Sequence, residues 1–308
     1  MKPRAHHLLL SLLGAMVIGS GAVPPALLGA PQTATPTDAP FWAGKPNAAE
    51  FAHRQDVRIA QARTAIEKLA AVKGPRTIAN TLAVYDEVQI LLDAAGSQAG
   101  LIENVHPDSA MRAVAEEESQ KVSALATEIS LDRRVYDALA ALDASKADAE
   151  TRFYLERELR EFRLAGVDKD EATRTRIKAL RDTLVKIGQE FDRNIRGDVR
   201  TIQVAGAADL DGLPADYIAN HKPGPDGKIT LDINYPDYVP VMTYAKSEEV
   251  RRRLYMEFQN RAHPKNLDVL DRMIANRHEL ANLLGFPTYA EYITANKMIG
   301  TAKNAREF

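Results

Sequence analysis

The 308-residue chain contains no cysteine. This absence excludes disulfide bonds, thiolate zinc sites, iron–sulfur clusters and cysteine nucleophiles, so His, Asp and Glu are the side chains left to bind a metal. An excess of charge of either sign is also missing, because 40 Lys and Arg oppose 42 Asp and Glu and leave a formal charge of −2. Without a basic field to attract phosphate groups, we expect no nucleic-acid partner.

Common short catalytic signatures are absent as well. The sequence has no G-x-S-x-G elbow, no phosphate-binding glycine loop and no G-x-G-x-x-G string, which weakens assignment to the commonest hydrolases, kinases and dinucleotide enzymes. What the chain does have is 45% hydrophobic and 27% charged residues. That balance is typical of a folded globular protein.

The N-terminus has the pattern of an export signal. Lys2 and Arg4 precede an apolar run over residues 8–18. The small residues 20–22 form the small-x-small pattern that signal peptidase cleaves. The run is much shorter than the ~20 residues that cross a bilayer as a helix. We therefore predict a signal peptide over residues 1–22, a periplasmic or secreted location, and no stable membrane insertion after cleavage. An uncleaved anchor is the alternative.

Residues 23–46 are rich in Pro, Ala, Thr and Gly. Such a composition buries too little apolar surface to offset the entropy of ordering the chain. We expect a flexible tail over this segment.

Apolar residues recur every three or four positions between residues 47 and 199, the spacing of amphipathic helices. Asn47 and Glu50 form a capping box at the start, and Gly166 is a stop signal. These features predict a helical domain over residues 47–199, with a loop around residues 96–107. The expected helices cover residues 47–72, 78–92, 111–129, 135–142, 153–162 and 177–195.

The period changes between residues 200 and 240. Residues 201–204 and 229–233 alternate apolar with polar side chains, and Pro-Asp-Gly at 225–227 indicates a turn. We expect a small antiparallel β element here. Helices resume over residues 241–308, and the predicted fold class is therefore mostly α: a multi-helix array with one small antiparallel β element. The helices expected in this last segment cover residues 250–258, 267–284 and a stretch that begins at the Thr288 capping box.

One string partly matches a zinc-binding helix. His278 and Glu279 supply the first two residues of H-E-x-x-H, but Asn282 occupies the position of the second histidine. The motif works because two imidazoles at i and i+4 on one helical face both coordinate the metal, while the Glu acts as general base. With one ligand missing, we interpret His278 as a surface or packing residue.

Other candidate groups have both a functional and a structural interpretation. His106, His221 and His263 occupy expected loops and could form a metal site only if the fold gathers them. The arginines at 251–253 could contact phosphate, but on a helix they point about 100° apart, which favours solvated surface.

Aromatic and acidic segments are likewise open to two interpretations. Tyr235, Tyr238 and Tyr244 lie between prolines and could line a peptide groove, although aromatic residues beside a β element are more often core. The acidic run at 116–118 is most simply a solvated helix face.

Several strings occur in a fixed order along the chain. They are Asn80-Thr81; His106-Pro107-Asp108 with Arg112; LREFRLAG at 159–166; FDRN at 191–194; YPDY at 235–238 with Tyr244-Ala245; Arg252 with Arg261-Ala262; and RHELANLLGF at 277–286 with Tyr289-Ala290 and Met298. Together they resemble the thimet oligopeptidase family of zinc metallopeptidases, which includes bacterial oligopeptidase A and peptidyl-dipeptidase.

The resemblance implies the N-terminal part of a larger α-helical metallopeptidase fold. Members of the family are longer, and their H-E-x-x-H helix, third zinc ligand and substrate-binding tyrosines lie downstream of the matched segment. Residues 241–308 then correspond to the helical start of the catalytic region. No catalytic or metal-binding residue carries over to this chain, and its substrate-binding residues stay unassigned. The family uses zinc, and we expect none to bind this chain alone.

Three functions compete at this stage. In the first, the chain is the N-terminal portion of a zinc-dependent oligopeptidase, a metalloendopeptidase or peptidyl-dipeptidase, and forms one wall of a channel that admits short unstructured peptides. It would be inactive alone and, if the protein is split, would pair with a C-terminal catalytic half. In the second, it is a non-catalytic exported helical module that binds peptides or a partner. In the third, it is an active hydrolase with a new metal site built from scattered histidines.

Overall fold

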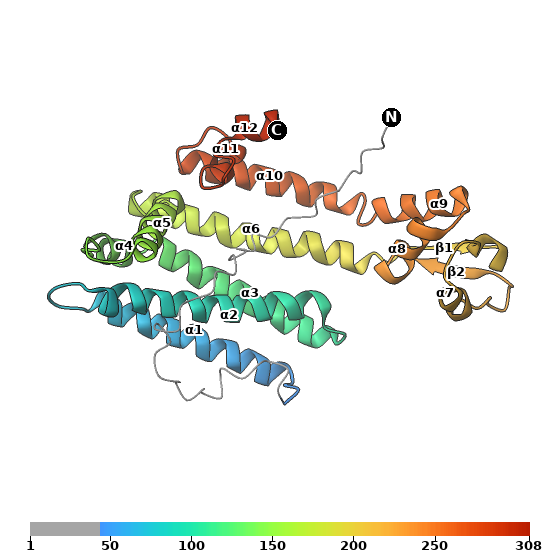
Figure 1. Ribbon diagram of the computed structural model, residues 1–308, viewed down its shortest axis with the longest axis horizontal. Helices are drawn as coiled ribbons and strands as arrows, with labels where there is room; N and C mark the ends of the chain where they lie inside the picture. Colours follow the sequence, from blue (N-terminus) through green and yellow to red (C-terminus); the bar gives the residue numbers. More distant parts are fainter. Residues whose placement is uncertain (1–43) are drawn as a thin grey trace. The chain divides into compact units, whose positions relative to one another are not determined.

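The computed structural model describes residues 44–308, and this part is mostly helical (Figure 1). It contains twelve α-helices and one two-stranded antiparallel sheet, which confirms the predicted fold class. The predicted signal peptide and nearly all of the predicted tail lie outside the described residues. Among the helices of residues 44–308, none combines the length and the apolarity that crossing a bilayer requires.

Seven helical segments make up the first part of the chain. Most begin at a polar residue whose side chain accepts a hydrogen bond from the first turn; the predicted capping box between Asn47 and Glu50 is present in both directions. The segments are α1 (Ala48–Ala70), the π-helical turn η3 (Ile78–Leu82), α2 (Ala83–Val105), α3 (Ser109–Ser130), α4 (Arg133–Ala140), α5 (Ala149–Ala165) and α6 (Glu171–Gly197).

The loop predicted around residues 96–107 is wrong, because α2 continues to Val105. Glycine in a helix costs only about 1 kcal/mol relative to alanine, and α2 buries Ala99 and Ile102 beyond Gly96. A Cβ on Gly96 would lie 3.4 Å from Val122 on α3. Packing against α3 therefore outweighs the propensity on which the prediction rested.

The large core of this part lies among α1 to α5 and includes Leu69, Leu92, Leu139 and Phe162. The chain leaves α5 at Gly166, which has a φ of 98° and caps the helix as predicted. Helix α6 then contacts α3 and also α10 (Lys265–Leu283).

The predicted β element is also present. Strand β1 (Thr201–Val204) pairs antiparallel with β2 (Ile229–Asp232), with Thr201 opposite Asp232 and Val204 opposite Ile229. The alternating pattern buries Ile202, Val204, Ile229 and Leu231 on one face.

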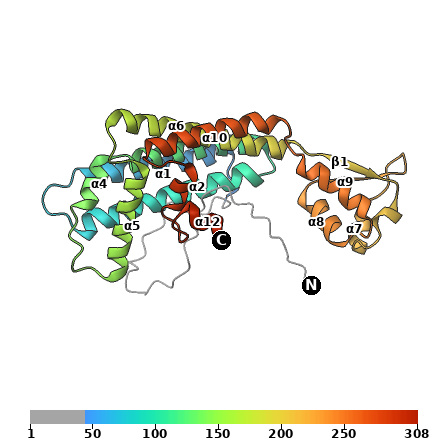
Figure 2. The same cartoon turned by 90° about the horizontal axis from the view of Figure 1, so that it is seen from above.

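Short helices pack against the buried face of this sheet (Figure 2). They are η4 (Ala207–Leu210) and α7 (Ala215–Asn220) between the strands, and α8 (Tyr235–Tyr244) and α9 (Glu248–Gln259) after them. One hydrophobic core joins the sheet to α7, α8 and α9 and extends as far as Leu254. We call residues 200–259 the small β/α unit.

The last helices are α10, α11 (Tyr289–Thr294) and α12 (Ala302–Glu307). Leu280 and Leu284 near the end of α10 pack with Ile177 and Leu180 of α6 in a separate core. Thr288 accepts a hydrogen bond from the amide of Glu291, 3.2 Å away, and starts α11 as the sequence predicts.

Candidate functional site

The partial zinc motif on α10 is held in structural contacts. The Asn282 side-chain amide lies 3.0 Å from Nε2 of exposed His278. Arg176 of α6 donates to both oxygens of Glu279 at 2.6 and 2.8 Å, and this hydrogen-bonded pairing holds the pKa of Glu279 below its usual value. Glu279 is therefore an ion-paired carboxylate, and it is not positioned as the base of a metal-bound water.

The three scattered histidines do not meet. His106 ends α2, where its Nδ1 accepts a hydrogen bond from the Asp108 amide at 3.1 Å. His263 precedes α10, and its carbonyl accepts from Arg200 at 3.3 Å. His221 follows α7. Nowhere in residues 44–308 do three His, Asp or Glu side chains gather as a metal site would require, so the described residues do not fit a zinc ion.

The three arginines of α9 point in different directions, and each has an acceptor within the protein. Arg251 donates to the carbonyls of Ala245 and Lys246. Arg252 pairs with Glu249 at 3.0 and 2.9 Å. Arg253 donates to the carbonyl of Gln203 on β1 at 2.8 Å. These contacts stabilise the small β/α unit, and they do not form one phosphate-binding surface.

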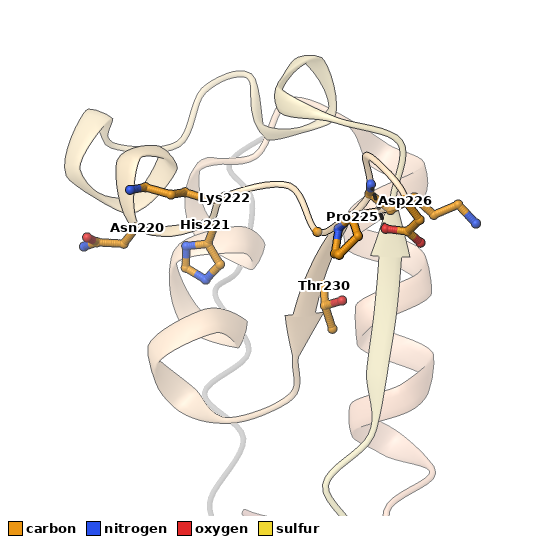
Figure 3. A pocket seen from close by; sticks show the side chains of 8 residues that line it. Asn220, His221, Lys222, Pro225, Asp226 and Thr230 are labelled. Carbon is orange, nitrogen blue, oxygen red and sulfur yellow. Dashed lines mark hydrogen bonds between the residues drawn. The ribbon is translucent and has the colours of Figure 1, made fainter.

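The small β/α unit has two neighbouring surface hollows that share Asn220 and His221. The larger, about 500 Å³, lies between the end of α7 and the turn before β2. Figure 3 shows the His221 ring between Asn220 and Lys222 on one side and Pro225 and Asp226 on the other.

The second hollow, about 350 Å³, lies between α7 and α8, and we call it the α7/α8 groove. Its α7 side is formed by Pro214, Asp216, Tyr217, Asn220 and His221. Its α8 side is formed by Pro236, Asp237, Pro240 and Tyr244. The α8 residues fall on one helical face because they are spaced by about one and two turns.

His221 is a fixed wall between the two hollows. Its Nδ1 lies 2.8 Å from the carbonyl oxygen of Tyr217, and its Nε2 lies 2.7 Å from Oδ1 of Asp237. The Tyr217 ring stacks on the imidazole at 3.9 Å. A carbonyl can only accept, so Nδ1 carries a proton and donates it to Tyr217. Both ring nitrogens are thus engaged, and His221 is available neither as a metal ligand nor as a general base.

Asp237 connects this pair to the sheet. Its Oδ2 accepts a hydrogen bond from the Asp232 amide at 2.8 Å. Burial and then the negative charge of Asp237 raise the pKa of Tyr217, so that hydroxyl stays neutral. The exposed polar side chains of the groove are Asp216, Asn220 and Tyr244, whereas those of His221 and Asp237 are 20% and 14% exposed.

Gly212 brings the two sides of the groove together. It has a φ of 94°, and a Cβ at this position would lie 2.3 Å from the carbonyl oxygen of Tyr244. The Lys246 amide also donates to the carbonyl of Asp211 at 2.9 Å. Only glycine allows this approach of the chain before α7 to the end of α8.

The tyrosines highlighted by the sequence have different positions. Tyr244 lines the groove and is 54% exposed. Tyr238 stacks on Phe258 with ring centroids 3.8 Å apart, while Tyr235 is 58% exposed and tilted against the same ring. The sequence therefore identified one groove tyrosine but missed Pro214, Tyr217 and Asn220. Pro214 precedes α7 as its N-cap, and such a proline indicates where a helix begins but not that a groove lies beside it.

Comparison with known proteins gives the family context. The model of peptidase family M3 matches residues 241–308, from within α8 through α12. Oligopeptidase A of Salmonella typhimurium is 26% identical over 275 residues, 81% of this chain and 39% of the relative. Saccharolysin of Saccharomyces cerevisiae is 25% identical over 285 residues, 89% of this chain and 39% of the relative.

A third relative, the thimet-like oligopeptidase of Dictyostelium discoideum, is 24% identical over 245 residues, covering 77% of this chain and 36% of its own length. The chain thus spans about two fifths of the length of the curated relatives it matches. Over most of its own length, it is homologous to the oligopeptidase A and thimet-like members of peptidase family M3.

Proposed function

We propose that the chain serves the hydrolysis of short unstructured peptides as the N-terminal portion of an M3-type zinc oligopeptidase, acting as a metalloendopeptidase or a peptidyl-dipeptidase. The observation that carries this proposal is the extent of the homology, which covers 81% of the chain at 26% identity to an oligopeptidase A. In this proposal the chain is inactive alone, and zinc would be held by residues other than those described.

The contacts of the described residues support this assignment. His278 has Asn282 at the position of the second ligand, and Glu279 is bound to Arg176. A hydrolytic step routed through α10 would need both groups free to face a metal and its water. We therefore assign α10 a packing role against α6 and no part in bond cleavage.

The second candidate is a non-catalytic helical module that binds peptides or a partner protein. The α7/α8 groove favours it, because its lining combines prolines and tyrosines with exposed polar groups and needs no metal. Export to the periplasm or the medium belongs to both candidates and rests on the pattern of residues 1–22. N-terminal sequencing of the mature protein tests export: a start after Ala22 supports it, and an intact Met1 in the cytosolic fraction contradicts it.

Two measurements separate the candidates. The first is the in-frame nucleotide sequence after codon 308: an H-E-x-x-H string supports the oligopeptidase portion. An immediate stop codon, with no separately encoded H-E-x-x-H protein that co-purifies with the chain, favours the binding module. The second is zinc content and cleavage of an internally quenched short peptide by the purified chain, with and without added zinc. We expect neither to exceed the blank. Stoichiometric zinc with cleavage would overturn both candidates in favour of an independent hydrolase.

A further inference from the structure

The α7/α8 groove presents hydrogen-bond acceptors to solvent. Asp216 is exposed on α7. The carboxyl group of Asp237 is hydrogen-bonded to His221 within the wall. The nearby cation Lys246 pairs with Asp211 at 3.1 Å and is not a lining residue. Asp216 is therefore the exposed charged side chain among the residues that line the groove, whereas Lys222 lines the neighbouring hollow. A carboxylate in this position suits a cationic group.

The two prolines of α8 remove amide donors from the α8 side of the groove. Pro240 lies inside the helix and has no amide hydrogen. The carbonyl of Pro236 consequently lacks the donor that it would have four residues later in a regular helix. Both prolines line the groove, so the α8 side offers no amide hydrogen at these two positions.

An aromatic face completes the surface. Tyr244 is 54% exposed at the end of α8 and lines the groove beside Pro240. Ammonium and guanidinium groups bind to carboxylates, and they also bind to the face of an aromatic ring. The prolines supply the apolar contact for the methylene groups that accompany a peptide cation.

The groove is also preorganised and small. Gly212 fixes the approach of its two sides, and the His221–Asp237 pair fixes its wall. A volume of about 350 Å³ is at the lower end of the range of roughly 300–1,000 Å³ for small-molecule sites. It therefore accommodates one or two residues of a peptide and leaves the rest of the peptide outside.

We propose that the α7/α8 groove binds the positively charged group of a short peptide, with Asp216 as the counter-charge and Tyr244 as the aromatic contact. This inference rests on the proposed function for the peptide nature of the ligand. The group is an ammonium, supplied either by the peptide N-terminus or by a lysine side chain.

The test uses fluorescence anisotropy of the full chain with Ala/Gly pentapeptides that carry a neutral C-terminal fluorophore. One peptide has a free N-terminus, one is acetylated, and one is acetylated but contains a single Lys. We expect the acetylated peptide without Lys to bind at least about five-fold more weakly than the better of the other two. The better of those two identifies the source of the ammonium.

Two variants and two matched controls locate the site. Asp216→Asn and Tyr244→Ala should each weaken binding of the cationic peptide about two- to five-fold. The controls are Asp93→Asn, an exposed carboxylate on α2, and Tyr235→Ala, an equally exposed tyrosine on α8 outside the groove. Circular dichroism of all four variants, compared with the unchanged chain, is the check that each variant is folded. The controls should bind as the unchanged chain does.

Three outcomes overturn the inference: no binding of any peptide at millimolar concentration, binding that is indifferent to peptide charge, or binding that the groove variants leave unchanged. The proposed function is judged separately by the sequence after codon 308. An in-frame H-E-x-x-H without charge-dependent binding leaves the function standing and removes this groove as a site. A stop codon without a co-purifying H-E-x-x-H partner, together with charge-dependent binding, supports the groove as a site and removes the proposed function.

Discussion

Replacement of Gly212 by alanine is the sharpest test of how the groove is built. The residue has a φ of 94°, and the new Cβ would lie 2.3 Å from the Tyr244 carbonyl oxygen and 3.3 Å from the Lys246 amide nitrogen. Both are backbone atoms, so no side-chain rotation relieves the overlap. A left-handed conformation costs an L-residue roughly 1–2 kcal/mol, and forcing extra atoms into packed surroundings adds about 1–3 kcal/mol.

Gly227 provides the matched control. Its φ is 77°, but a Cβ there would have no atom within 4 Å. Gly227→Ala should therefore lower the free energy of unfolding only by the conformational cost, about 1–2 kcal/mol. Gly212→Ala should lower it further by about 1–3 kcal/mol, as measured by urea unfolding followed by circular dichroism. Equal losses in the two variants would refute the close approach of α7 and α8.

Three further predictions concern other parts of the described chain. Glu158 accepts a hydrogen bond from Tyr85, and burial raises its pKa; its contribution to stability is present at low pH and lost as pH rises through the folded-state pKa. The free energy of unfolding is measured with urea at pH 4.5 and pH 7.5 for Glu158→Gln and for the unchanged chain. The variant should be more stable relative to the unchanged chain at pH 7.5 than at pH 4.5, and the same difference at both pH values would contradict this. Phe162→Ala, at a 2% exposed core position, should lower the free energy of unfolding by about 3–5 kcal/mol; a loss below 1 kcal/mol would be inconsistent with this packing. Leu267 and Ile274 are 52% and 55% exposed on one side of α10, and such exposed apolar side chains favour association, so we expect the purified chain to self-associate in light scattering. Replacing both residues with Lys should reduce this association without lowering the melting temperature. Unchanged association would show that this surface is not responsible.

Helix α8 illustrates how packing can override local sequence preferences. The segment from Tyr235 to Tyr244 looked like an aromatic stretch bounded by prolines, and a helix was not expected there. Pro236 is tolerated in the first turn, whereas Pro240 removes an internal hydrogen bond. Helix α8 nevertheless buries Val241 completely in the core shared with the sheet and α9. That burial, a tertiary effect, offsets the proline cost.

The candidate site shows the same division. The sequence indicated His221 and Tyr244 for different reasons. His221 was one of three histidines considered as possible metal ligands, and Tyr244 was considered as a groove or core residue. It could not show that His221 has both ring nitrogens engaged by Tyr217 and Asp237. The sequence also gave no indication that Pro214 and Pro240 line the same groove. No sequence motif relates residues of two short helices that are separated by a strand.

By itself, the sequence determined the elements whose causes are local. The helical period, the Asn47 capping box, the Gly166 stop and the alternation in β1 and β2 each depend on residues a few positions apart. Only the tertiary structure decided which polar groups are paired with distant residues and which face solvent. Arg176 reaches Glu279 across 103 positions of the chain, and Gly212 brings α7 to the end of α8. Such contacts depend on how the helices pack against one another, and the spacing of residues along the chain does not predict them.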